Sequence, residues 1–209
     1  MKTRSKLIAA WSKMASKTGA PPTSIPRFCS RLDIEERDFY RLFPSMQALE
    51  RAFWREQIER VIRSVKNGEE YGSFDARQRF LSVVFAFLED SLSYRSLLLM
   101  RFQDSPACRV RELARFDETI REFVSEILEQ GRETGEVAER GKLTRIYPEG
   151  FVLLFHRIIH FHLRDESEGY ERTDAFVEKS VKLAFDVIST QAIDSAIDLA
   201  RFLVPACRV

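Results

Sequence analysis

Apolar residues recur every three or four positions along most of this chain, which is the spacing that places side chains on one face of an α-helix. The chain has 8 Gly and 7 Pro among 209 residues, and long stretches contain neither. No alternating pattern typical of β-strands competes with this spacing. The sequence therefore predicts an all-α protein.

The helices can be placed from their apolar spacing and from the residues that begin and end them. Pro44 should end the third predicted helix, and Ser45 should cap a long fourth one. Asp33 lies in the turn before the third helix, where it can adopt a left-handed backbone conformation. The predicted helices span residues 3–17, 24–32, 35–43, 45–66, 75–92, 94–104, 108–131, 147–164 and 173–203.

Charge is distributed unevenly, although the formal net charge is only +1. Residues 1–31 contain seven Lys and Arg and no Asp or Glu, whereas residues 33–38 contain four acidic residues and Arg37. A basic N-terminal unit is what a phosphate backbone attracts. The length and this asymmetry predict two domains, residues 1–46 and 47–209.

Other classes of protein find little support in the sequence. No apolar run is long enough for a membrane span, and the N-terminus does not resemble a signal peptide. Cys29, Cys108 and Cys207 form no metal-binding or redox motif, which suggests reduced thiols in a cytoplasmic protein. No phosphate-binding loop, catalytic triad or carboxylate pair is evident, so we expect neither an enzyme nor a cofactor.

The segment SIPRFCSRLDIEERDFYRLFPSMQAL, residues 24–49, resembles the TetR family of one-component bacterial regulators. It has a short helix begun by Ser, a tight turn, and a helix that ends in Tyr-x-x-Phe-Pro-Ser. The resemblance implies an N-terminal three-helix helix-turn-helix domain, joined by a long fourth helix to a larger helical domain for ligand binding and dimerisation. It also implies a homodimer that binds operator DNA and is controlled by a hydrophobic small molecule.

The same resemblance implies which residues contact DNA. Ser24 would contact a phosphate at the N-terminus of the second helix, and Tyr40 would donate its hydroxyl to another phosphate. The remaining candidates on this unit are Arg27, Arg37, Arg41 and Ser45. The sequence departs from the family at Asp33, where Gly is common, and at Glu36, Asp38 and Met46, where Lys or Thr is common.

These departures leave two interpretations open. Carboxylates that face a phosphate backbone weaken binding to DNA, although Glu and Asp can also accept a hydrogen bond from the amino group of cytosine. The chain is therefore either a DNA-binding regulator or a protein that keeps the helix-turn-helix only as a folded unit. In the second case it would be an accessory protein that binds a lipid or an isoprenoid, a use of this fold that residues 170–189 also suggest.

A ligand pocket, if present, should be lined by bulky apolar side chains. The candidates are Phe85, Met100, Phe116, Phe123 and Phe155, with His156 and His160 as polar groups that orient the ligand. The alternatives are a solid core that contains two hydrogen-bonded histidines, or a metal held by the histidine pair. We predict no metal, because no third ligand with suitable spacing is evident.

The last two predicted helices are candidates for the dimer interface. Small residues recur at four-residue spacing in the last helix, which allows close helix packing. The pair could form half of a two-fold four-helix bundle, or it could pack only within its own chain. The pentapeptide PACRV occurs at residues 106–110 and 205–209 and has no evident physical explanation.

Overall fold

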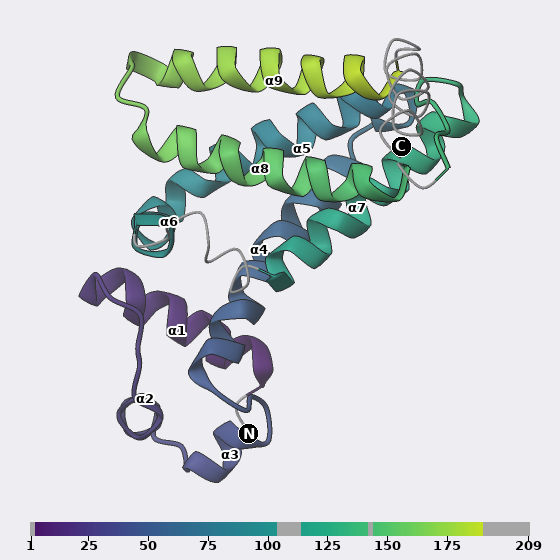
Figure 1. Ribbon diagram of the computed structural model, residues 1–209. Coiled ribbons are helices and arrows are strands. Elements are labelled where there is room, and N and C mark those ends of the chain that lie inside the picture. Colours follow the sequence, from purple (N-terminus) through teal and green to yellow (C-terminus); the bar gives the residue numbers. More distant parts are fainter. Residues whose placement is uncertain (1–2, 104–113, 142–143, 190–209) are drawn as a thin grey trace, which may run out of the picture. The chain divides into compact units, whose positions relative to one another are not determined.

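The computed structural model describes residues 3–103, 114–141 and 144–189, without the side chains of residues 101–103 and 114–116. Throughout these residues the regular structure is helical, which confirms the predicted all-α class (Figure 1). Short 3-10 turns lie at Tyr71–Ser73, Leu92–Tyr94, Thr144–Ile146 and Glu168–Tyr170. The helices are α1 (Arg4–Thr18), α2 (Ile25–Leu32), α3 (Glu36–Tyr40), α4 (Met46–Lys66), α5 (Ala76–Ser91), α6 (Arg95–Gln103), α7 (Ala114–Glu133), α8 (Tyr147–Arg164) and α9 (Glu171–Ser189).

Most predicted helices lie within a residue or two of their observed positions, and α8 has the predicted bounds. The prediction for α3 was too long, because the helix ends at Tyr40 and not at Phe43. The amide of Leu42 donates to the carbonyl of Phe39, three residues back. Pro44 disfavours the α conformation in the residue before it, so the last turn tightens. Helix α9 begins at Glu171, two residues before the predicted start.

Several predicted features lie outside the described residues. They are the start of the helix predicted at 108–131, the end of the helix predicted at 173–203, and both copies of PACRV.

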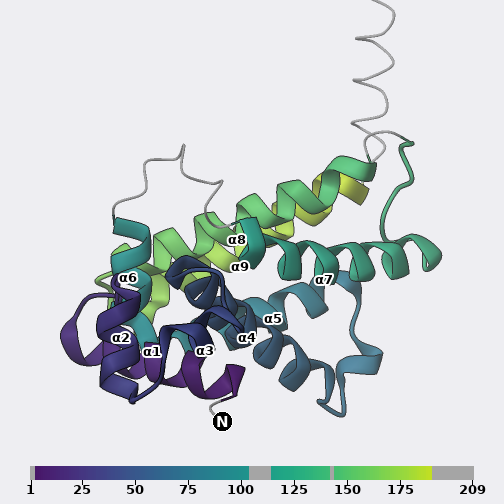
Figure 2. The same cartoon turned by 90° about the horizontal axis from the view of Figure 1, so that it is seen from below.

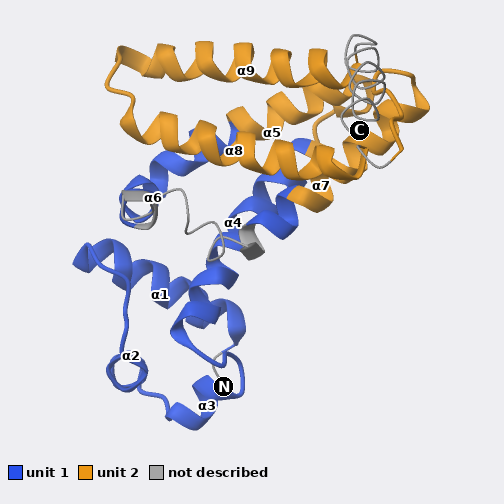
Figure 3. Ribbon diagram, in the orientation of Figure 1, with its two compact units in different colours: residues 1–65, 86–120 blue, residues 66–85, 121–209 orange. Residues whose placement is uncertain are grey.

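The chain divides into two compact units (Figure 3). Unit 1 comprises residues 1–65 and 86–120, and unit 2 comprises residues 66–85 and 121–209. This division follows backbone proximity. It does not test the predicted domain boundary between residues 46 and 47, which stays a prediction.

Aromatic rings form much of the core of unit 1. The ring of Trp11 in α1 lies 5.3 Å from that of Phe53 in α4, and Phe53 lies 6.1 Å from Tyr94. Trp54 also contacts the ring of Tyr94, at 5.8 Å. Tilted and edge-to-face pairs of this kind add to the stabilisation from burial. They join α1, α4 and the turn after α5 into one core.

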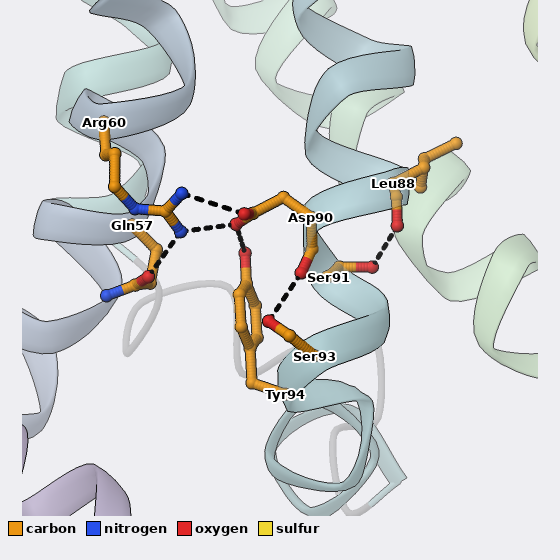
Figure 4. A network of polar contacts seen from close by, with 7 residues as sticks. All are labelled: Gln57, Arg60, Leu88, Asp90, Ser91, Ser93 and Tyr94. Carbon is orange, nitrogen blue, oxygen red and sulfur yellow. Dashed lines mark hydrogen bonds and ion pairs between the residues drawn. The ribbon is translucent and has the colours of Figure 1, made fainter. Parts of the chain in front are cut away.

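A polar network joins α4 to the end of α5 within the same unit (Figure 4). Two guanidinium nitrogens of Arg60 donate to the two carboxylate oxygens of Asp90, at 2.9 and 2.7 Å. The hydroxyl of Tyr94 donates to the same carboxylate at 2.9 Å, and Gln57 accepts from Arg60 at 2.8 Å. Burial and the neighbouring Asp90 raise the pKa of Tyr94 far above its usual range. Tyr94 therefore stays protonated and remains a hydrogen-bond donor.

In unit 2, α8 and α9 run side by side in both views (Figures 1 and 2). Phe151 in α8 lies 5.1 Å from Phe80 in α5 and 4.9 Å from Phe185 in α9, measured between ring centroids. All three rings are buried. They join the two long helices to α5 at one end of the pair.

At the other end of the pair, the carboxylate of Asp165 fixes the connection from α8 to α9. It accepts hydrogen bonds from the amide and hydroxyl of Ser167, at 2.9 and 2.7 Å. It also accepts from the amide and hydroxyl of Thr173, at 2.8 and 2.6 Å. These donors, Thr173 foremost, hold the pKa of Asp165 well below its usual range.

We predict that Asp90→Asn destabilises the protein by about 2 kcal/mol, because it removes the charge from a partly buried carboxylate that has three donors. Tyr94→Phe should cost about 1 kcal/mol, since it removes one hydrogen bond. The free energy of unfolding, measured with urea, would check both values.

The matched control is Glu59→Gln. Glu59 pairs with Arg55 in the same helix at 2.6 Å, and such i,i+4 pairs contribute only about 0.3–0.5 kcal/mol. Equal losses from Asp90→Asn and Glu59→Gln would contradict a special role for the network.

Candidate nucleic-acid interface

Helices α2 and α3 and the turn between them form the candidate site. The hydroxyl of Ser24 accepts a hydrogen bond from the amide of Arg27 at 3.4 Å, which caps α2. Pro26 lies in the first turn, where its lack of an N–H costs nothing. The sequence therefore determines locally where α2 begins, as predicted.

The turn between α2 and α3 depends on Asp33, which has a left-handed backbone (φ 52°, ψ 57°). The amides of Asp33 and Ile34 donate to the carbonyls of Ser30 and Cys29, at 3.3 and 3.2 Å, and so close the end of α2. Asp tolerates this conformation better than most residues other than Gly. Asp33 thus adopts the conformation that was expected to be open to it.

Buried phenylalanines hold α2 and α3 together. The rings of Phe28 in α2 and Phe39 in α3 meet edge to face at 6.0 Å. Phe39 also contacts Phe43 at 6.1 Å and Tyr40 at 5.7 Å. Because Phe39 points inward, Tyr40 points outward, and 52% of its surface is exposed.

Charged side chains surround Tyr40, and several of them pair with one another. Arg41 forms an ion pair with Asp38 at 3.2 Å, and Arg37 forms one with Glu35 at 3.5 Å. Exposed pairs of this kind contribute little to stability. They do, however, place a carboxylate against two of the three arginines that were predicted to contact DNA.

The structure places five of the six predicted DNA-contacting residues on this one helix-turn-helix segment. Ser24 and Arg27 lie at the start of α2, while Arg37, Tyr40 and Arg41 lie in or directly after α3. The hydroxyl of Ser45 accepts from the amide of Ala48 at 3.1 Å and so caps α4. Whether these residues contact DNA stays a prediction.

Arg4 belongs to this region and was missed by the sequence reasoning. Its guanidinium lies 4.3 Å from the ring centroid of Phe43 and donates to the carbonyl of Leu42 at 3.1 Å. It thereby joins the start of α1 to the chain after α3. Only the basic character of residues 1–31 hinted at it, because nothing in the sequence gives its partners.

The predicted ligand-binding side chains are distributed over both units. Met100 belongs to unit 1, and Phe85, Phe123, Phe155, His156 and His160 belong to unit 2. Phe123 and Phe155 are buried, and Phe85, Met100, His156 and His160 are half-buried. The side chain of Phe116 lies outside the described residues. A pocket lined by these residues stays a prediction.

The described residues contain neither a metal-binding cluster nor a membrane-spanning helix. Within residues 3–103, 114–141 and 144–189, no cluster of His, Cys, Asp and Glu could hold a metal ion. Over the same part of the chain, no helix is long and apolar enough to cross a membrane.

We predict that Arg4→Ala lowers the free energy of unfolding by about 1 kcal/mol, through loss of the contacts with Phe43 and Leu42. If the surface binds DNA, Arg4→Ala should also weaken binding more than Lys6→Ala does. Lys6 is exposed on the same helix, so both variants lose one positive charge. Urea unfolding and DNA titration check the two effects, and identical behaviour of both variants would contradict the positioning role.

Comparisons with known proteins agree with this architecture. Residues 79–203, more than half of the chain, match the family model described as "Tetracyclin repressor-like, C-terminal domain". No curated protein matches the chain significantly.

Solved structures resemble the chain over most of its length. The TetR-family transcriptional repressor QsdR of R. erythropolis has a TM-score of 0.60 at 15% identity, covering 90% of this chain and 94% of its own. A putative TetR-family transcription regulator from Shewanella sp. PV-4 has a TM-score of 0.59 at 13% identity, covering 90% and 100%. A Rhodococcus sp. RHA1 protein of unknown function scores 0.59 at 17% identity, covering 91% and 97%. The chain belongs to the TetR family and has the all-helical fold of its transcriptional regulators.

Proposed function

We propose that this protein is a transcriptional regulator that binds operator DNA as a homodimer and responds to a hydrophobic small molecule. Residues 1–46 would be the DNA-binding domain, and residues 47–209 the domain for ligand binding and dimerisation. In this role the protein would act in the cytoplasm and would catalyse no reaction.

The observation that carries the proposal is the α2–turn–α3 segment. Its turn is closed by Asp33 in a left-handed conformation, and Tyr40 is exposed beside it. Arg27 is exposed in the first turn of α2, where the helix dipole also favours an anion. This geometry suits contacts to phosphates on either side of a groove.

Exposed apolar side chains on α8 and α9 support dimerisation. Leu153 in α8 and Leu183 in α9 are 57% and 64% exposed, and Val187 is 42% exposed. Several large apolar side chains exposed on neighbouring helices are typical of an interaction surface. A second copy would cover them if the two helix pairs formed a four-helix bundle.

Support for a hydrophobic effector comes from the family and from the aromatic content of unit 2.

The second candidate is the lipid- or isoprenoid-binding accessory protein with a vestigial helix-turn-helix. The pairing of Arg37 with Glu35 and of Arg41 with Asp38 favours it. Each pair must break or rearrange before its arginine can neutralise a phosphate.

We predict that specific DNA binding is weak and strongly dependent on salt, because it relies on few basic residues. Fragments selected from genomic DNA by the purified protein would provide the operator. Tyr40→Phe and Arg41→Ala should weaken binding to it, and Arg41→Ala should lower the salt slope by about 1. Asp38→Asn should strengthen binding, because it releases Arg41.

The control for these variants is Arg63→Ala, which removes an exposed charge from α4 and should leave binding unchanged. Tight binding at physiological salt that is indifferent to Tyr40→Phe and Arg41→Ala would contradict this account of α3. Failure to select any fragment would favour the accessory protein.

For self-association, we predict a dimer at micromolar concentration that Leu183→Asp converts to a monomer, because a carboxylate would be desolvated at the interface. Leu92→Asp is the control, since Leu92 is also an exposed leucine but lies in unit 1. Light scattering gives the mass of each variant. A monomeric wild-type protein would contradict the proposal that the regulator is a homodimer.

A further inference from the structure

A hollow of about 350 Å³ lies at the end of the α8–α9 pair where Asp165 makes the connection. Its lining includes three arginines, Arg157 and Arg164 from α8 and Arg172 from α9. Its volume is within the range of small-molecule sites, which begins at about 300 Å³. Phe123 and Phe155 of the expected apolar pocket do not line it, whereas His160, which was predicted to orient a ligand in that pocket, does.

The three guanidinium groups are free to bind a ligand. Among the described residues, none of Arg157, Arg164 and Arg172 forms an ion pair, and all three side chains are exposed. Asp165 also lines the hollow, but its two oxygens accept the four hydrogen bonds from Ser167 and Thr173. The lining carboxylate is therefore committed to the helix connection.

Two phenylalanine rings form an apolar wall of the same hollow. Phe161 of α8 and Phe176 of α9 stack with centroids 4.5 Å apart and planes inclined by 10°. Both residues line the hollow. A flat apolar group in the hollow could contact this pair while a charged group contacts the arginines.

His160 also lines the hollow, together with the three arginines. Burial, followed by the positive charges of Arg164 and Arg157, lowers the pKa of His160. The imidazole is therefore neutral at neutral pH, and a neutral imidazole offers one N–H donor. The hollow thus combines three permanent positive charges with an uncharged hydrogen-bonding group.

We propose that this hollow is a binding site for a small organic anion. A carboxylate or phosphate group would be held by Arg157, Arg164 and Arg172, and a flat apolar portion would lie against Phe161 and Phe176. The planar guanidinium matches both kinds of anion through paired hydrogen bonds. The proposal goes beyond the regulatory function and does not depend on DNA binding.

Isothermal titration calorimetry of the full chain with phenyl phosphate, benzoate and inorganic phosphate tests the site. We expect saturable binding of phenyl phosphate or benzoate, with the phosphate ion about tenfold weaker than phenyl phosphate because it has no apolar portion. The phenyl phosphate and benzoate arms also distinguish a phosphate ligand from a carboxylate ligand.

Two variants locate the binding, and one serves as a control. Arg164→Gln should weaken binding of the preferred aromatic anion about tenfold or more. Phe176→Ala should weaken the aromatic anion but leave inorganic phosphate unchanged. Arg77→Gln removes an exposed arginine from α5, also in unit 2, and should change nothing. Circular dichroism checks that each variant is folded.

Three results would overturn the proposal. The first is the absence of saturable binding by all three probes at millimolar concentration. The second is equal weakening by Arg164→Gln and Arg77→Gln, which would indicate nonspecific attraction to a positive surface. The third is weaker self-association of Arg164→Gln in sedimentation without anion binding by the wild type, which would mean that a second copy fills the hollow. Loss of DNA binding alone would leave the proposal intact.

Discussion

The connection between α8 and α9 depends on one buried carboxylate. Asp165 accepts hydrogen bonds from two backbone amides and two hydroxyls within eight residues, and so satisfies donors that would otherwise be buried without partners. This fixes where α9 starts relative to the end of α8. The stacking of Phe161 on Phe176 and the cluster of Phe151 with Phe185 both require that register. The arginine-lined hollow of unit 2 also depends on it, because Arg172 of α9 lines the hollow together with Arg157 and Arg164 of α8.

Charge organisation differs between the two surfaces to which we assign binding roles. Around α3, Arg37 and Arg41 each pair with a nearby carboxylate, so the phosphate contacts expected of these two arginines begin with a competing interaction. At the end of α8 and the start of α9, the arginines have no such competitor among the described residues, because Asp165 is engaged elsewhere. Similar residue types therefore produce a nearly neutral surface in one unit and a cationic hollow in the other.

Local features were predictable from the sequence, and contacts between distant residues were not. Helix α8 has its predicted bounds because Pro148 and the apolar residues that indicate it lie next to one another in the sequence. The cap at Ser24 and the turn at Asp33 were predictable for the same reason. By contrast, Arg4 finds Leu42 across 38 residues and Arg60 finds Asp90 across 30. The spacing of apolar residues predicts which face of a helix is buried, but not which other segment packs against that face. The arginines around His160 went unnoticed for this reason, since Arg172 joins them only when α9 folds back along α8.

Unit 1 is assembled from two separate stretches of chain, residues 1–65 and 86–120, and the intervening residues belong to unit 2. The aromatic core of Trp11 and Phe53 therefore includes Tyr94 from the second stretch. Tyr94 is synthesised only after the first stretch and the first segment of unit 2. Helices α1 and α4 would leave the ribosome with part of their shared core absent. Completion of this aromatic core during synthesis must therefore wait until Tyr94 has been made, after the first segment of unit 2.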